Sequence, residues 1–451
     1  MKKVCLLVFI ALLATGAVAQ PEKTAWVDSV FRTLTLREQV AQLLLLRAPT
    51  PATPDALLQF QRQLLTLHPG GIWITAGTPV RHVNTVNFLQ TLTPVPLLVA
   101  MNAEYGPGQT LDSLIQLPPP LVLGALKNDS LVQAVGFENA RLLRQLGVHL
   151  TFAPQADVDM PTGPGFLSYF SNDKLRVARK AVAYANGLQQ GGVMAVATHA
   201  YQDFESSSVD TALQINTALL DTLGFYPYVE LIRNNVGGVL TSYLHFNTVE
   251  KKKVIPAPVS TLVVNTFLKQ KLGFKGLTFA DIPTVAKLTA KVRPGEAALL
   301  ALEAGHDVLI NPGDPALVVK KLSTAVKRNK KLRDQVAVSV KKILAAKYEA
   351  GLSQSRIVDR AAARALSAPR PAARLAEAVL EQAVTVVNQT RDLPIGLLEG
   401  RTFFSMALGS PEEAEPLERY IKKYVPLQTY HLRKPTDTLG WPAATEDAVV
   451  I

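Results

Sequence analysis

Asp281 occupies the position in this chain that is best suited to chemistry. It follows Gly276–Ala280, a short apolar stretch that predicts a buried strand entered through a glycine. It precedes Ile282-Pro283, where the proline cannot continue strand pairing. A carboxylate at the C-terminal end of a parallel barrel strand is a standard place for catalysis. Aspartate is also a favoured N-cap of a helix. The position alone leaves both interpretations open.

The elements that would position Asp281 alternate between helix and strand patterns. Short apolar runs predict strands at Ile72–Ile74, Leu97–Met101, Val148–Ala153, Val193–Thr198, Val239–Tyr243, Gly276–Ala280 and Asp307–Asn311. Helical patterns separate them, and this alternation favours a parallel sheet covered by helices. About seven such units favour a closed TIM-type (β/α)8 barrel over an open sheet. Gly106-Pro107-Gly108 lacks the third glycine of a nucleotide loop, so a dinucleotide cofactor is excluded.

Helix and strand signals also mark the two ends of this pattern. The capping-box sequence Thr35-Leu36-Arg37-Glu38 predicts a helix whose buried side includes Val40, Leu43 and Leu44. Further along, Thr402–Leu408 predicts a strand, Pro411–Tyr424 a helix and Ala448–Ile451 the beginning of another strand. We therefore expect a barrel over 20–352, a linker over 353–374 and a second, incomplete α/β domain over 375–451. Because the chain stops on an apolar run, we expect it to be a fragment or the product of a truncated gene.

Residues 1–19 have the pattern of a secretory signal peptide. Lys2 and Lys3 precede the apolar run Val4–Leu13, and Ala17-Val18-Ala19 offers a small-residue cleavage site. The run is too short to span a bilayer, so we expect an exported protein, periplasmic or extracellular, with no membrane span in the mature chain. Cys5 is the only cysteine and lies in this leader, which excludes disulfides, thiol catalysis and thiolate metal sites from the mature chain.

The formal net charge of +11 raises the question of an anionic partner. Much of the excess lies in lysine runs such as Lys251-Lys252-Lys253 and Lys327–Lys331, which resemble solvated helix faces and lack interleaved aromatic residues. We therefore expect no nucleic-acid partner. No His/Asp/Glu spacing indicates a metal site, and no cofactor is expected. His149 and His306 are interpreted as structural, and Trp73 as a core residue.

Seven stretches, in order and at matching spacing, resemble glycoside hydrolase family 3, and most closely its β-N-acetylhexosaminidase branch. They are Thr35–Leu43, Val95–Gly106, Gly147–Asp159, Gly191–His199, Leu272–Asp281, Ala301–Pro312 and Ser339–Leu352. The resemblance implies a barrel followed by an α/β sandwich, and the tail from about Leu375 resembles only the start of that second domain. It also implies retaining hydrolysis through a glycosyl-enzyme, with Asp281 as the nucleophile.

The proton-transfer group of that family is replaced in this chain. In the hexosaminidase branch a loop histidine paired with an aspartate is the acid/base. The matching triplet here reads Asp210-Thr211-Ala212, so Asp210 is a remnant of the pair and a methyl group stands where the histidine would be. Asp203 and Glu205 lie in the same loop and are possible substitutes, provided that one of them lies ~5–5.5 Å from Asp281. Alternatively, both are solvated loop carboxylates.

Residues that would bind the sugar are replaced as well. The resemblance implies a Lys-His pair, which reads Thr198-His199, and an aspartate, which reads Asn102. His199 matches a family histidine, although a lone histidine at a strand end is as often structural. Two arginines of the pattern read Thr110 and Ser168. Each charge-assisted contact contributes roughly 1.5–3 kcal/mol, so the losses predict weak substrate binding.

Two functions remain open at this point. The first is a glycosidase that acts on β-linked N-acetylglucosamine with impaired catalysis. The second is a non-catalytic pseudoenzyme that binds a glycan, a muropeptide or a protein partner. Fold alone does not decide between them.

Overall fold

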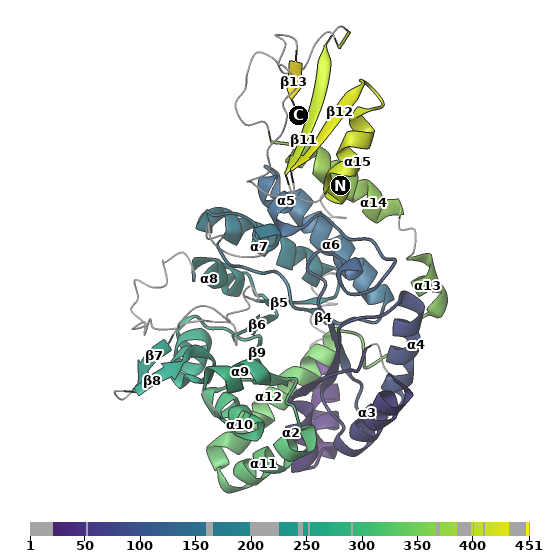
Figure 1. The fold of residues 1–451 in the computed structure, drawn as a ribbon. Helices are drawn as coiled ribbons and strands as arrows, with labels where there is room; N and C mark the ends of the chain where they lie inside the picture. Colours follow the sequence, from purple (N-terminus) through teal and green to yellow (C-terminus); the bar gives the residue numbers. More distant parts are fainter. Residues whose placement is uncertain are drawn as a thin grey trace, which may run out of the picture. The chain divides into compact units, whose positions relative to one another are not determined.

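Eight short parallel strands form a closed barrel in a computed structural model, in the order β1-β10-β9-β6-β5-β4-β3-β2 (Figure 1). The structure describes residues 21–50, 53–158, 166–198, 225–241, 247–250, 253–289, 292–366, 370–385, 398–399, 401–408, 411–432 and 448–450. The strands are β1 Leu44–Arg47, β2 Gly71–Ile74, β3 Leu98–Met101, β4 Leu150–Thr151, β5 Met194–Ala197, β6 Gly238–Leu240, β9 Leu277–Asp281 and β10 Val308–Ile310. The predicted TIM-type (β/α)8 barrel is confirmed.

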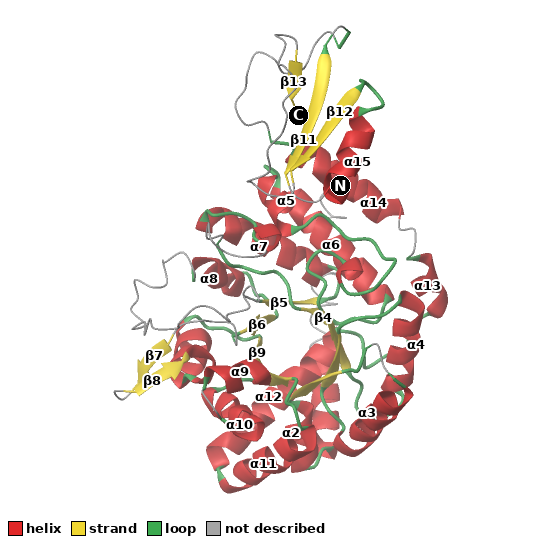
Figure 2. Cartoon of the chain, in the orientation of Figure 1, coloured by secondary structure: helices red, strands yellow, loops and turns green. Residues whose placement is uncertain are grey.

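Helices surround the barrel strands (Figure 2). They are α2 Leu36–Gln42, α3 Pro54–Leu67, α4 Pro79–Gln90, α5 Pro120–Ala125, α6 Asp129–Gln145, α7 Lys174–Gln190, α8 Tyr226–Arg233, the π-helix η5 Leu262–Lys271, α9 Ile282–Leu288, α10 Pro294–Ala304, α11 Pro315–Arg328 and α12 Lys330–Glu349. A further helix covers 21–33. The predicted capping box is present, because Thr35 accepts a hydrogen bond from the Glu38 N–H while the Glu38 carboxylate accepts one from the Thr35 N–H.

The first barrel strand was predicted wrongly, as a continuation of the helix that begins at Leu36. The helix ends at Gln42, and the leucine run continues as β1, Leu44–Arg47. β1 pairs with β2 on one side and with β10 on the other, so it closes the barrel. The run Leu43–Leu46 is apolar and buried throughout, so it carries no periodicity by which to distinguish helix from strand.

Aromatic side chains fill part of the barrel interior. Trp73 of β2 packs edge-on against Phe152, with ring centroids 5.8 Å apart, and Phe152 packs edge-on against Phe279 of β9 at 6.1 Å. Each such pair contributes about 0.5–1.5 kcal/mol beyond the area that it buries. Trp73, Phe152 and Phe279 therefore point inward, and the strand residues in register with them share this orientation.

A buried carboxylate joins β9, β10, η5 and α12 on the outer side of the barrel. Asp307 accepts hydrogen bonds from the Thr278 N–H at 3.0 Å, from Ser339 Oγ at 2.7 Å and from Lys342 Nζ at 2.7 Å. Lys269 Nζ lies 3.3 Å away. Burial alone would raise the pKa of Asp307, but the two lysines and the hydrogen bonds lower it to about 2.

The chain between β6 and η5 contains a hairpin of two antiparallel strands, β7 Asn247–Glu250 and β8 Lys253–Pro256 (Figure 2). Lys253, which was expected on a helix face, therefore begins a strand. Lys320 and Lys321 lie in α11, and Lys341 and Lys342 lie in α12.

The chain divides into two compact units, Met1–Val384 and Thr385–Ile451. The first includes α13 Arg360–Ala365, which packs on α4, and α14 Arg370–Ala383, which packs on α5 and α6. The division thus follows α14, whereas the sequence placed residues from 375 on in the second domain.

The second unit holds a three-stranded parallel sheet in the order β12-β11-β13, with α15 packed on β11 and β12. The elements are β11 Thr402–Leu408, α15 Pro411–Ile421, β12 Leu427–Leu432 and β13 Ala448–Val450. Glu418 of α15 accepts a hydrogen bond from Ser405 Oγ and pairs with His431 Nε2, each at 2.9 Å. The helix is thereby fixed to the sheet in a parallel α/β arrangement.

Candidate active site at the mouth of the barrel

Asp281 is the last residue of β9, at the edge where the C-terminal ends of the strands meet, here called the mouth of the barrel. It is in register with Ile310 of β10 and lies on the same face of β9 as Phe279, so its side chain points inward. The residue is also the N-cap of α9: its Oδ2 accepts hydrogen bonds from Thr284 N at 3.1 Å and from Thr284 Oγ1 at 2.6 Å. The two interpretations of this residue are thus compatible.

Burial governs the electrostatics of Asp281. The residue is 8% exposed, and this loss of water raises the pKa of its carboxyl group above the usual value. The two hydrogen bonds from Thr284 and the positive charge of Arg47 oppose the shift. A carboxylate that is poorly hydrated and held in one orientation is suited to nucleophilic attack.

Asn102 and Thr198 lie at the same mouth. Asn102 directly follows β3 and is exposed, while Thr198 directly follows β5 and is 9% exposed. β3 is four places from β9 in the closed order of eight strands, so Asn102 and Asp281 lie on opposite sides of the mouth. The main chain of Thr198 is fixed by hydrogen bonds with Pro154 O and Ala156 N, each at 3.0 Å. The structure thus brings these three predicted site residues to one opening.

Arg47 is a residue of the mouth that the sequence did not reveal. It ends β1 in register with Trp73, and its guanidinium carbon lies 5.8 Å from the centroid of the Trp73 ring. Its side chain is exposed, and its charge acts on Asp281. The available signal was a single basic residue at the end of the leucine run, which had been read as helix.

Glu104 is a second residue of the site that was not predicted from the sequence. It follows β3 and is 9% exposed, and its Oε1 accepts a hydrogen bond from the Gln155 N–H at 2.7 Å. Burial, together with the nearby charge of Asp157, raises the pKa of Glu104 to about 8 despite that hydrogen bond. The carboxyl group is therefore largely protonated at neutral pH. It was visible only as the acidic residue two positions after Asn102.

The buried histidines do not contribute to this mouth. His149 Nδ1 accepts a hydrogen bond from the Val99 N–H at 3.0 Å, and burial lowers its pKa to about 3. His306 Nε2 lies 2.8 Å from Pro258 O, and burial lowers its pKa to about 4. Both hold the fold together, as expected. Among the described residues, no group of three or more His, Cys, Asp or Glu side chains could hold a metal ion.

Comparison with known proteins decides the family. Residues 35–346 match the model of the "Glycosyl hydrolase family 3 N terminal domain".

The chain belongs to glycoside hydrolase family 3.

Curated relatives in this family agree with the match. One is the "Beta-N-acetylglucosaminidase/beta-glucosidase" of Cellulomonas fimi, 24% identical over 390 residues that cover 82% of this chain and 68% of the relative. Another is "Beta-hexosaminidase LpqI" of Mycobacterium tuberculosis (strain ATCC 25618 / H37Rv), 28% identical over 310 residues that cover 65% and 77%. The predicted resemblance to the hexosaminidase branch of family 3 is confirmed.

Solved structures share the fold. The glycoside hydrolase family 3 β-N-acetylglucosaminidase from Paenibacillus sp. str. FPU-7 aligns with a TM-score of 0.71 at 24% identity, over 88% of this chain and 80% of that one. "Beta-glucoside phosphorylase BglX" aligns with a TM-score of 0.75 at 20% identity, over 93% and 78%.

The remaining residues predicted from the family 3 pattern fall into two groups. His199, Asp203, Glu205, Asp210 and Ala212 lie outside the described residues. The two positions where arginine was expected are described: Thr110 directly follows η1 Pro107–Gln109, and Ser168 ends η2 Phe166–Ser168. The Thr110 hydroxyl donates a hydrogen bond to the main-chain oxygen of Asn102. The short side chain of Thr110 thus fixes the loop at the position where the family pattern has an arginine.

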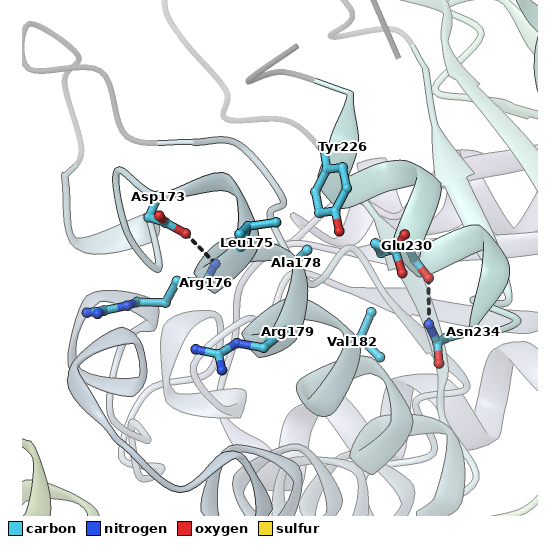
Figure 3. Close-up of a pocket in the computed structure, with 9 residues that line it drawn as sticks. All are labelled: Asp173, Leu175, Arg176, Ala178, Arg179, Val182, Tyr226, Glu230 and Asn234. Carbon is cyan, nitrogen blue, oxygen red and sulfur yellow. Dashed lines mark hydrogen bonds between the residues drawn. The ribbon is translucent and has the colours of Figure 1, made fainter. Parts of the chain in front are cut away.

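A groove of about 560 Å³ lies between α7 and α8, outside the strands of the family 3 barrel (Figure 3). Charged, polar and apolar side chains line it: Asp173, Leu175, Arg176, Ala178, Arg179, Val182, Tyr226, Glu230 and Asn234. None of these is a residue of the mouth. The groove therefore adds no group to the candidate active site.

Proposed function

We propose that this protein is a glycoside hydrolase of the β-N-acetylhexosaminidase type whose turnover is low. The observation that carries the proposal is the buried Asp281 carboxylate at the C-terminal end of a barrel strand, at the position that matches the family nucleophile. Relatives named as β-hexosaminidases and a β-N-acetylglucosaminidase support the substrate class. The carboxylate would attack the anomeric carbon and break its bond to the aglycone oxygen, which leaves with a proton. Water would then hydrolyse the resulting glycosyl-enzyme.

The low turnover follows from the residues that the chain lacks. Ala212 cannot transfer a proton, and a general acid contributes a factor of ~10²–10⁴ to the rate. Thr198 cannot donate the charge-assisted hydrogen bonds of a lysine, and Asn102 accepts hydrogen bonds without the negative charge of an aspartate. Asp203 or Glu205 would then provide slower proton transfer, with Asp210 as the remnant of the original pair.

The test is hydrolysis of an aryl N-acetyl-β-glucosaminide by the purified protein and by Asp281→Asn. Asparagine is as good an N-cap as aspartate, so the variant keeps the fold and removes the nucleophile. We expect slow turnover by the wild type and none by D281N. Equal rates for the two proteins would overturn the proposal.

A second candidate is a glycan-binding protein without catalysis. It is favoured by the bonds from Thr284 to Asp281, because capping α9 is by itself a sufficient reason for an aspartate at this position. Calorimetry with chitobiose or with muropeptides tests this function, since it predicts binding heat without turnover. The double variant Thr198→Lys/Ala212→His separates the candidates further. Activity that appears only in this variant indicates a degenerate enzyme.

The proposal extends to the location of the protein. The charged and apolar pattern of 1–19, which ends in Ala17-Val18-Ala19, supports export to the periplasm or the cell exterior. Within the described part of the chain, no helix is both long enough and apolar enough to cross a membrane. Export would bring the protein to β-linked cell-wall glycans.

A further inference from the structure

Arg47 brings a positive charge to the mouth of the barrel. It is in register with Trp73, and Trp73 points into the barrel, where it meets Phe152. In-register residues of neighbouring parallel strands share one face, so Arg47 also points inward. Its guanidinium carbon lies 5.8 Å from the centroid of the indole ring, so the cation lies beside an apolar surface.

The donors of Arg47 have no acceptor in the part of the chain that the structure describes. A guanidinium carries five N–H donors, yet within the described ranges no carboxylate or carbonyl bonds to this one. Asp281 interacts with it electrostatically, but Oδ2 of Asp281 receives its two bonds from Thr284. The neighbouring Trp73 Nε1 is buried and also lacks an acceptor among the described residues. Buried N–H groups normally find a partner, so the Trp73 donor calls for an acceptor, and the exposed Arg47 donors beside it are open to the same one.

The charges around Arg47 do not neutralise it. Asn102, which follows β3 two strands away from Arg47, is uncharged, and the pKa of about 8 keeps the Glu104 carboxyl largely neutral. Burial raises the pKa of Asp281, so that carboxylate is held less readily in its charged form. An arginine remains charged throughout the physiological range. The described part of the mouth therefore combines a fixed cation with weakened or missing anions.

We propose that Arg47 and Trp73 make the mouth of this barrel a binding site for a β-linked sugar that carries a carboxylate. The inference rests on the proposed function, because it names the class of sugar taken by the same site. A guanidinium matches the two oxygens of a carboxylate in a bidentate pair, and the Trp73 N–H supplies a donor beside it. The ion pair between Arg47 and this carboxylate would then compensate for the cationic contacts that the family pattern has lost at Thr110, Ser168 and Thr198.

The experiment measures binding by calorimetry with three methyl β-glycosides: the glucuronide, the glucoside and the N-acetylglucosaminide. The host protein is Asp281→Asn, in which hydrolysis cannot interfere. We expect the glucuronide to bind about tenfold more tightly than the glucoside, as one charge-assisted contact would produce. Adding Arg47→Gln should reduce this preference to less than about twofold.

Arg62→Gln is the matched control, because Arg62 is an exposed residue of α3 whose loss changes the net charge equally. This variant should keep the full preference for the glucuronide. A preference that survives in R47Q, or that is absent from the host protein, would overturn the inference. An equal loss in R62Q would also overturn it, because the effect would then be one of overall charge. Binding of the glucuronide without hydrolysis of any glycoside by the wild type would refute the proposed function while leaving this inference intact.

Discussion

Oδ2 of Asp281 accepts two hydrogen bonds from one residue, Thr284: the main-chain N–H at 3.1 Å and the hydroxyl at 2.6 Å. The candidate nucleophile is therefore also the N-cap of α9. Its conformation is set by the helix that it begins, which orients the carboxylate before any substrate arrives. An arrangement of this kind lowers the entropic cost of reaching an attacking geometry.

Substitution of Asp281 should separate capping from catalysis. D281A removes both functions and should lower the free energy of unfolding by about 0.5–2 kcal/mol, the usual cost of a lost N-cap. D281N keeps the cap and should unfold at nearly the wild-type denaturant concentration, although its turnover is lost. Urea titration and the aryl glycoside assay measure the two effects on the same samples. If D281N were as unstable as D281A, the cap would not be the structural role of this residue.

Glu104 should make the protein less stable as the pH rises. Its folded-state pKa of about 8 lies above the unfolded value near 4.5, so the folded state holds a proton that the unfolded state releases. The contribution is fully present below about pH 4.5 and is lost as the pH rises to about 8. E104Q, which mimics the protonated form, should gain thermal stability over the wild type between pH 5 and 8. Melting temperatures across this range test the prediction, with the exposed Glu381→Gln as a control whose difference from wild type stays constant.

Lys347 should make the protein more stable as the pH rises above about 7. Burial lowers its pKa to about 7, and its Nζ donates to Gln42 Oε1 at 2.6 Å. Between this value and the unfolded pKa near 10.5 the unfolded state binds more protons, so stability rises with pH over this interval. K347M should remove the rise, whereas the exposed K331M should keep it. The melting temperatures of the three proteins at pH 7 and pH 9.5 provide the comparison, and parallel curves would contradict the prediction.

Replacing Asp307 should lower the free energy of unfolding more than replacing any of the other residues above. D307N leaves Lys269 and Lys342 without their shared anion, and breaking a buried ion pair costs about 3–5 kcal/mol. The lower end applies, because the two lysine side chains are 22% and 24% exposed and can reach water. Urea unfolding of D307N measures the loss. A cost below about 1 kcal/mol, typical of a surface pair, would show that the network does not stabilise the barrel.

The sequence predicted the barrel because apolar strands and glycine-terminated helices recur along the chain. It located Asp281 for the same reason, since a carboxylate after a buried strand is visible locally. β1 was missed because four leucines in a row fit a helix and a strand equally well. The error also concealed Arg47, whose place at the mouth depends on its being the end of a strand.

Other properties of the site arise only in three dimensions. Glu104 is followed by ordinary loop residues, and its raised pKa depends on burial and on Asp157, far away in sequence. The pairing of Arg47 with Trp73 depends on the register of two strands, which is set by the closed barrel. Local patterns therefore identify residues whose side chains can take part in chemistry. They do not show which of these side chains lie close enough to interact.

The closure of the barrel by β1 and β10 has a consequence for synthesis. β1 is made first, but its second neighbour, Val308–Ile310, emerges from the ribosome only after more than half of the chain. Until then the nascent sheet has two open edges, β1 and whichever strand was made last, and their unpaired N–H and C=O groups invite pairing with other chains. A nascent chain stalled before Val308 should therefore be the form that most needs a chaperone.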